Sequence, residues 1–405
     1  MSDVLKGLRV VELGSHVAVP MAARIMADWG AEVIKIEPPK GEDYRTMGRT
    51  YDLPHSEDHN VMFQLGNAGK KSLPINLKSP EGKEVLLKLF ETTDIFLTNT
   101  RHASMERLGL DYDTIKARFP KLIYAEFTAF GLTGPDKDRP GFDIAAYWAR
   151  SGALIEWSEA ESTPSKPMGG FGDSTSGSML LAGILATLYK RDKTGQGGHL
   201  DLSLYGAALW YNAIGVLIGQ EQFGHHYPKS RYNQYLPTSP LYKTKDGDWV
   251  LISAWNWGSK SDEFLTLFGI TDWVGNPEYN TIPGAKKNIK IIIERIEKAI
   301  AQISTKDLLA GLLKMDVVYE KLANPSEPYK DPQAWENGYL REITFKNGEK
   351  AVVPVLPLHF DGKDTTTFTM APHLGQDSAA LLKELGYSDA EVKKLAQDGA
   401  VIVRG

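Results

Sequence analysis

The alternation of strand and helix patterns at the start of the chain is the feature that most limits its fold. Residues 8–13 form a short, largely β-branched run that ends at Gly14, and residues 31–37 form a second run that ends before Pro38. Between them lies an apolar pattern of helical spacing, which stops at Gly30. Two parallel strands need a crossover of this kind, so these residues predict one βαβ unit.

The same alternation continues along the first half of the chain. Strands are predicted at residues 94–98, 122–127 and 199–202, and helices at residues 79–90 and 173–190. The first of these helices starts with Ser-Pro, the residue types preferred as helix cap and first helical residue. Strands that alternate with helices form a parallel sheet covered on both faces, so we predict a doubly wound, Rossmann-like α/β domain.

A second domain is expected because this alternation stops near residue 225, where prolines punctuate a linker. The chain of 405 residues also exceeds the roughly 100–200 residues of a single domain. We predict a large α/β domain over residues 1–224, a smaller α+β domain over residues 225–325, and a return of the chain to the large domain over residues 326–405.

Composition excludes several classes of chemistry. The chain has no cysteine, which rules out a thiolate nucleophile, disulfides, cysteine-ligated zinc and iron–sulfur clusters. The histidines lack the HExxH spacing of a zinc site, so no metal is predicted. A net charge of -5 disfavours non-specific binding to nucleic acid. No Walker loop, GxGxxG or GxSxG motif is present, so the doubly wound fold is expected to serve a different chemistry.

The longest apolar runs argue against a membrane protein. Residues 177–189 and 206–219 are each shorter than the roughly 20 residues that span a bilayer, and we interpret both as buried helices. The first residues show no secretory pattern, so the protein is expected in the cytoplasm with no membrane partner.

The most informative segment is Gly169-Gly170-Phe171-Gly172-Asp173, directly before a long apolar helix. One interpretation is structural, with Asp173 as a helix cap after an ordinary glycine turn. The other is catalytic. A helix N-terminus keeps a carboxylate ionised, and glycines let a thioester approach the backbone. Such a carboxylate can attack an acyl-thioester to give a mixed anhydride, with nearby N–H groups stabilising the oxyanion. The two interpretations are compatible.

An ordered set of motifs extends over nearly the whole chain, which thereby resembles the family III CoA-transferases, also named after the carnitine and bile-acid CoA-transferases. The motifs lie at residues 5–13, 26–37, 76–82, 141–143, 172–177 and 194–197. The resemblance implies that Asp173 forms a mixed anhydride and an aspartyl-CoA thioester. It also implies a CoA thioester as co-substrate with no further cofactor, and an interlocked homodimer, which the linkers near residues 225 and 325 would permit.

The resemblance further implies a CoA site on the doubly wound domain. The matching positions are Val17, Ala18, Lys78, Asn99, Arg107, Phe142 and Asp143. Lys78 and Arg107 would make charge-assisted contacts with the polyanionic carrier, although each alone would also fit a solvated surface cation. Pro38 replaces an arginine that some relatives have after the second strand, so one contact on the adenine side is expected to be lost or to be supplied by Arg45.

The motifs at residues 134–143 and 147–152 resemble most the branch that activates 2-hydroxy acids in amino-acid fermentation. This implies CoA exchange between a 2-enoyl-CoA and an apolar 2-hydroxy acid such as phenyllactate or 2-hydroxyisocaproate. Trp255 and Trp257 stand where oxalate-specific members have consecutive glycines, and indoles favour an apolar acyl group.

Three alternatives remain at this point. An α-methylacyl-CoA racemase needs two acid/base groups, but Phe142 stands where such enzymes have histidine. A carnitine or dicarboxylate CoA-transferase would share the nucleophile. A non-catalytic CoA-binding subunit would not need an ionised carboxylate beside a thioester.

Overall fold

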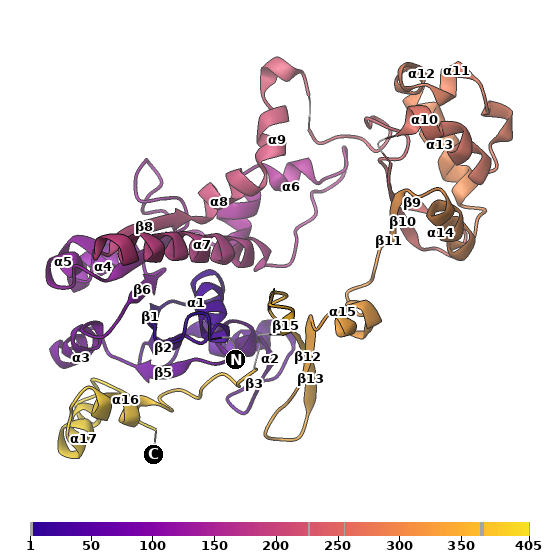
Figure 1. Ribbon diagram of the computed structural model, residues 1–405. Coiled ribbons are helices and arrows are strands. Elements are labelled where there is room, and N and C mark those ends of the chain that lie inside the picture. The colour runs from indigo at the N-terminus through magenta and orange to yellow at the C-terminus, as the bar shows by residue number, and fades with distance from the viewer. Residues whose placement is uncertain (1–2, 226, 255, 365–367, 405) are drawn as a thin grey trace. The chain divides into compact units, whose positions relative to one another are not determined.

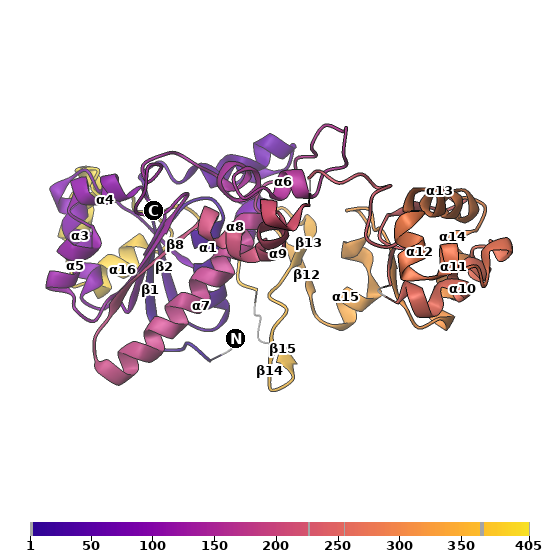
Figure 2. The same cartoon turned by 90° about the horizontal axis from the view of Figure 1, so that it is seen from above.

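The chain forms two compact units. The computed structural model describes residues 3–225, 227–254, 256–364 and 368–404. The first unit takes in the chain up to Ala153, Lys166–Val216 and the chain from Asp331 onward, and the second takes in Leu154–Ser165 and Leu217–Lys330 (Figures 1 and 2). The domain limits predicted after residues 224 and 325 lie near two of these changes and stay predictions.

A six-stranded parallel sheet organises the first unit. Its strands are β1 (Arg9–Leu13), β2 (Glu32–Glu37), β5 (Lys71–Pro74), β6 (Ile95–Thr98), β7 (Ile123–Thr128) and β8 (Gly198–Ser203). Their order in space is β5-β2-β1-β6-β7-β8, which is the doubly wound arrangement 3-2-1-4-5-6. The predicted fold is confirmed, and each predicted strand agrees within one residue at either end. Strand β5 was not predicted, because between the lysine at its start and the proline at its end Leu73 is the one apolar residue.

Helices cover both faces of this sheet (Figure 1). On one face, α1 (Ala18–Asp28) and α7 (Phe171–Thr194) pack against each other. They cross closely, because a Cβ at Gly177 would lie 2.5 Å from the Ala18 carbonyl oxygen. On the other face, a continuous apolar core joins the sheet to α3 (Pro80–Phe90), α4 (His102–Leu108), α5 (Tyr112–Arg118), α16 (Ser378–Glu384) and α17 (Asp389–Gln397).

The helix ends follow local sequence with one correction. Ser79 caps α3 as predicted, since its Oγ accepts a hydrogen bond of 2.9 Å from the Gly82 N–H. Helix α7 begins two residues before Asp173, after Gly170, whose φ is 101°. Only glycine adopts that backbone conformation at little cost. The interpretation of Asp173 as the helix cap is therefore wrong, and Asp173 lies within the first helical turn.

The apolar run 206–219 forms α8 (Leu204–Tyr211) and α9 (Ala213–Ile218). No helix among the described residues is long and apolar enough to cross a membrane. The run was predicted to be buried, yet Trp210 is 72% exposed and Ile214 is 74% exposed. Ala207 and Ala208 are buried, but the prediction of burial is wrong for the rest of this run in the single chain, because the described residues leave side chains such as Trp210 and Ile214 exposed.

The remaining elements of the first unit are short. They are η1 (Asp43–Tyr51), β3 (His55–Ser56), β4 (His59–Asn60), α2 (Val61–Asn67), the π-helical turn η2 (Ile144–Ala149), α15 (Pro332–Glu336), β12 (Leu340–Thr344), β13 (Lys350–Pro354), β14 (His359–Phe360) and β15 (Lys363–Asp364). A further helix, α6 (Ala153–Glu156), begins at the boundary between the two units.

The second unit is an α+β fold, as predicted. Its antiparallel sheet has the order β11-β10-β9. Its elements are η3 (Glu221–Phe223), β9 (Tyr242–Lys243), β10 (Trp249–Ser253), α10 (Trp257–Leu267), η4 (Thr271–Trp273), α11 (Pro277–Asn280), α12 (Ile282–Lys287), α13 (Ile289–Ile300), α14 (Thr305–Lys314), β11 (Val318–Lys321) and η5 (Pro328–Lys330).

Trp257 belongs to the core of this second unit. It is fully buried, its Nε1 donates a 3.0 Å hydrogen bond to the Tyr279 carbonyl oxygen, and its ring stacks on Phe264. The expectation that Trp257 offers apolar surface to a substrate is therefore wrong, because this unit's own packing uses that surface. Trp255 lies outside the described residues.

Candidate active site

A pocket of about 410 Å³ opens in the first unit, where β1, β6 and β7 end. Strands β1 and β6 are neighbours that lead to different parts of the doubly wound sheet, and ligands bind at this switch point in such folds. The pocket is lined by residues 15–18, 99, 101–104, 107, 127–129, 137–142, 173 and 204.

The pocket brings together most of the site residues predicted from sequence. Those that line it are Val17, Ala18, Asn99, Arg107, Phe142 and Asp173. Lys78 does not line it and lies exposed before α3. Asp143 does not line it either, because its side chain is buried. The roles assigned to all these residues stay predictions.

Asp173 is half-buried at the pocket. Its carboxylate accepts no hydrogen bond from any residue the structure describes. Burial, and then the like charge of Asp143, raise the pKa of Asp173 to about 7. The expectation that the helix N-terminus keeps this carboxylate readily ionised is therefore wrong. Asp173 is an unusually basic carboxylate with its lone pairs free.

The backbone N–H groups of Gly170 and Gly172, at the start of α7, interact with the Asp143 carboxylate. The Gly170 N–H donates a 2.6 Å hydrogen bond to Asp143 Oδ2, and the Gly172 N–H also favours the charged form of Asp143. The sequence interpretation expects nearby N–H groups to stabilise an oxyanion, and this stays a prediction. The Gly170 N–H is not available for that role, because it already donates to Asp143.

More basic side chains line the pocket than the sequence analysis predicted. The cationic side chains and histidines that line it are His16, Arg101, His102, Arg107, Lys137 and Arg139. The Nδ1 atom of His102 forms a 2.8 Å hydrogen bond with Glu126 Oε1. Arg107 donates a 2.8 Å hydrogen bond to Ser104 Oγ. Of this group the sequence prediction contained only Arg107. The proximity of Arg101 and His102 to Asn99 after β6 was the available signal. Such a rim suits a polyanionic ligand.

No group of three or more histidine, aspartate or glutamate side chains in the described part of the chain could hold a metal ion.

Asn99, in the segment after β6, forms two hydrogen bonds with the backbone of the turn after β1, and both segments line the pocket. Its Nδ2 donates to the Ser15 carbonyl oxygen at 2.9 Å, and its Oδ1 accepts from the Ser15 N–H at 3.0 Å. The next residue, His16, has a φ of 65°, which is strained for a residue other than glycine. Its N–H donates to Glu42 Oε2 at 2.8 Å. The conformation of this turn is thus set by side chains from two other segments.

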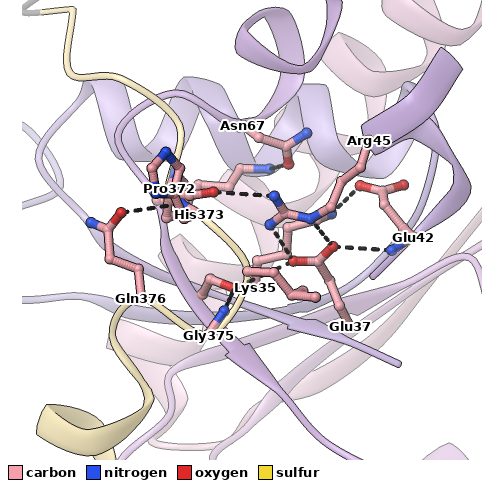
Figure 3. A network of polar contacts seen from close by, with 12 residues as sticks. Lys35, Glu37, Glu42, Arg45, Asn67, Pro372, His373, Gly375 and Gln376 are labelled. Atoms are coloured by element: carbon pink, nitrogen blue, oxygen red, sulfur yellow. Dashed lines mark hydrogen bonds and ion pairs between the residues drawn. The ribbon is translucent and has the colours of Figure 1, made fainter. Parts of the chain in front are cut away.

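Glu42 belongs to a cluster of buried charges beneath the pocket, part of which Figure 3 shows. Lys35 Nζ lies 2.7 Å from both Glu12 Oε1 and Glu42 Oε1. Lys35 and Glu12 are fully buried, and they are register partners on β1 and β2. Burial opposes the charge on Lys35, but the surrounding carboxylates outweigh it and raise the pKa of Lys35. The sequence interpretation missed this cluster.

Arg45 is held in the same region. Its Nε and Nη2 each donate a 2.7 Å hydrogen bond to Glu37, and its Nη1 donates to the Pro372 carbonyl oxygen at 3.2 Å (Figure 3). Its guanidinium also lies over the Phe63 ring. The expectation that Arg45 replaces a missing ligand contact is therefore wrong, because this bidentate pair occupies the guanidinium.

Comparison with known proteins points to one family. A family model described as CoA-transferase family III matches residues 5–378. A (R)-2-hydroxy-4-methylpentanoate CoA-transferase of Clostridioides difficile is 36% identical over 98% of this chain and 99% of that protein. A cinnamoyl-CoA:phenyllactate CoA-transferase of Clostridium sporogenes is 34% identical over 100% of this chain and 98% of that protein. A solved CAIB/BAIF family protein from Brucella suis is 28% identical, with a TM-score of 0.80 over 95% of this chain and 100% of that chain.

We expect Lys35→Met to lower the free energy of unfolding by about 3–5 kcal/mol, because it leaves two buried carboxylates without their shared cation. Denaturant unfolding measures the change. Lys40→Met is the matched control, since Lys40 and Asp43 form an ion pair at 3.7 Å with side chains 79% and 77% exposed. Such a pair contributes at most about 1 kcal/mol. Equal stability of the two variants would contradict the structural role of Lys35.

Proposed function

This chain belongs to CoA-transferase family III, and we propose that it moves CoA from a 2-enoyl-CoA to an apolar 2-hydroxy acid through covalent intermediates on Asp173. The observation that carries the proposal is the state of Asp173. A half-buried carboxylate with a raised pKa and no hydrogen-bond donor in the described chain faces a pocket lined with cations. This is the environment expected of a carboxylate nucleophile.

The proposed chemistry conserves the thioester bond energy. A carboxylate oxygen of Asp173 attacks the acyl-CoA carbonyl carbon, the C–S bond breaks, and CoA leaves as the thiolate. The thiolate then attacks the Asp173 carbonyl carbon of the mixed anhydride, which releases the donor acid and forms an aspartyl-CoA thioester. The acceptor carboxylate repeats both steps in reverse order, which yields the new acyl-CoA and free Asp173.

The cations of the pocket support the assignment of CoA as the shared carrier. CoA carries several phosphate charges, and arginines bind phosphate in a planar, bidentate manner. Arg101, Arg107 and Arg139 lie on one pocket with Lys137. Lys78 keeps its predicted role as a more peripheral contact.

The assignment of an apolar 2-hydroxy acid rests on the relatives and on the pocket lining. The two relatives described above act on 2-hydroxy-4-methylpentanoate and phenyllactate according to their names. Phe127, Phe142 and Leu204 provide apolar surface at the pocket. Phe142 also argues against a racemase, because it cannot transfer a proton. Trp257 does not support this assignment, because its indole is buried in the core of the second unit.

We retain the predicted homodimer as part of the proposal. The exposed apolar side chains of α8 and α9, Trp210 and Ile214 among them, would then be covered by a second copy of the chain. A monomeric molar mass in solution would contradict it.

Asp173→Asn should reduce CoA transfer at least about a thousandfold while CoA binding persists, because the amide cannot form the anhydride. Hydroxylamine trapping and peptide mapping should label Asp173 in the wild type. Asp192→Asn, an exposed position on the same helix, is the control. Labelling of another carboxylate would refute the assignment.

Asp173→Asn should also stabilise the fold above pH 7. The folded pKa of about 7 exceeds the ordinary value of about 4, so the wild type loses stability as the pH rises between these values. The amide has no such dependence. Melting temperatures of both proteins across this range test the sign.

Arg107→Ala should raise the KM for every acyl-CoA by about tenfold and leave the preference among acids unchanged, because Arg107 is proposed to hold the carrier. High salt should reduce the difference. Arg118→Ala, an exposed arginine of α5 outside the pocket, is the control. A changed preference among acids at constant CoA affinity would instead place Arg107 at the acyl group.

With purified protein, CoA transfer to 2-hydroxyisocaproate or phenyllactate should be roughly ten to a hundred times faster than transfer to oxalate, succinate or carnitine, because burial of an apolar side chain favours binding by about 1.5–3 kcal/mol. A panel of acceptors with one acyl-CoA donor measures this. Faster turnover of carnitine or a dicarboxylic acid would refute the substrate class and leave the role of Asp173 intact.

A further inference from the structure

The family resemblance places Asp143 in the CoA site, but Asp143 is a buried carboxylate next to the glycine turn before Asp173, and the reaction steps described above do not use it. Asp143 is 3% exposed and does not line the pocket. Its Oδ2 accepts the Gly170 N–H, while its Oδ1 is buried and accepts no hydrogen bond from the described chain. A buried, incompletely paired carboxylate lowers stability, so its presence requires an explanation.

The elements around Asp143 hold it against the first turn of α7. Asp143 directly precedes the π-helical turn η2, and such turns are rare and recur at functional sites. A Cβ at Gly172 would overlap Asp143 Oδ1 and the ring of Tyr147. Glycine directly before Asp173 is therefore what allows Asp143 to stand behind the nucleophile.

We propose that Asp143 is a positioning residue for Asp173: it anchors the glycine turn that presents Asp173 to the pocket, and its like charge makes Asp173 a more basic and more nucleophilic carboxylate. The inference rests on the proposed function of Asp173. Two carboxylates whose charges influence one another do not both ionise readily. The Gly170 N–H decides which ionises first, because Asp143 has a donor and Asp173 has none.

The pKa shifts of Asp143 and Asp173 agree with the inference that Asp143 ionises first. Burial raises the pKa of both carboxylates. For Asp143 the N–H groups of Gly170 and Gly172 counteract burial, whereas for Asp173 the charge of Asp143 adds to it. The other titratable or charged groups at the pocket or beside this turn are His16, Tyr44, Arg101, His102, Arg107, Lys137, Asp138, Arg139 and Tyr147. The charge of Asp173 in turn contributes to the raised pKa of Tyr44.

This arrangement has a predictable effect on the reaction. Attack on the thioester needs ionised Asp173, so kcat/KM should fall as the pH drops below about 7. A carboxylate with a pKa near the working pH combines a large ionised fraction with high basicity. Removing the charge of Asp143 should make Asp173 easier to ionise but less nucleophilic.

Asp143→Asn tests the proposal, because its amide oxygen can still accept from the Gly170 N–H while the charge is lost. The measurement is the pH dependence of kcat/KM for CoA transfer. The acid limb should move to lower pH by about one unit, and kcat on the alkaline plateau should fall. Asp192→Asn, which removes an exposed charge at the far end of α7, should leave the acid limb in its wild-type position.

An Asp143→Asn enzyme that retains transfer with an unmoved acid limb overturns the proposal, including the case in which kcat falls for structural reasons alone. Should this variant not fold, Asp143→Ser decides by the same criterion, because its hydroxyl also accepts a hydrogen bond without charge. Absence of transfer in the wild type would refute the proposed function instead. The carbon-13 chemical shift of the Asp173 carboxyl group, titrated with and without the charge of Asp143, would then still decide the inference.

Discussion

A lysine buried between two carboxylates connects the central sheet to a turn that lines the pocket. Lys35 on β2 binds Glu12 on β1 and Glu42 ahead of η1, so one cation joins two strands of the sheet to the segment that follows them. The second oxygen of Glu42 binds the His16 N–H, which extends the cluster to the turn after β1. His16 has a left-handed backbone conformation, which persists only where surrounding contacts stabilise it. Glu42 of this cluster provides such a contact. Lys70 forms an ion pair with the other carboxylate oxygen of Glu12. Burial and the nearby charge of Lys35 lower the pKa of Lys70 to about 8.

The balance of burial and neighbouring charge that sets the state of this cluster also raises the pKa of Asp173. Glu37 is buried, but two hydrogen bonds from Arg45 and the charge of Lys35 lower its pKa despite burial. Burial and the like charge of Asp143 act on Asp173, and no described residue donates a hydrogen bond to its carboxylate. The pKa of Asp173 is therefore raised, whereas that of Glu37 is lowered. The pKa of a carboxylate removed from water therefore depends on its partners. Asp173, which accepts no hydrogen bond from a described residue, lines the pocket.

Membership of the family and the choice of substrate depend on different parts of the molecule. The matched family model and the cations of the pocket both concern the carrier that every member of a CoA-transferase family must handle. An apolar acyl group would be selected by apolar contacts, and Phe142 and Leu204 are apolar side chains that line the pocket. Trp257 shows that a sequence position alone does not identify such a contact, because its indole is used inside the second unit.

The sequence by itself determined the doubly wound fold, the limits of five of the six strands of its sheet and the position of Asp173 near the start of a long helix. Those features depend on periodicity, caps and glycine turns, which are local in the chain. Only the tertiary structure decided that Glu12 and Lys35 are buried rather than solvated, that Arg45 is occupied by Glu37, and that Asp143 lies behind Asp173. Charged residues in strands look alike in a sequence whether they face water or each other. Glu12 and Lys35 meet because the parallel register of β1 and β2 sets them side by side, and that register exists only once the sheet has formed.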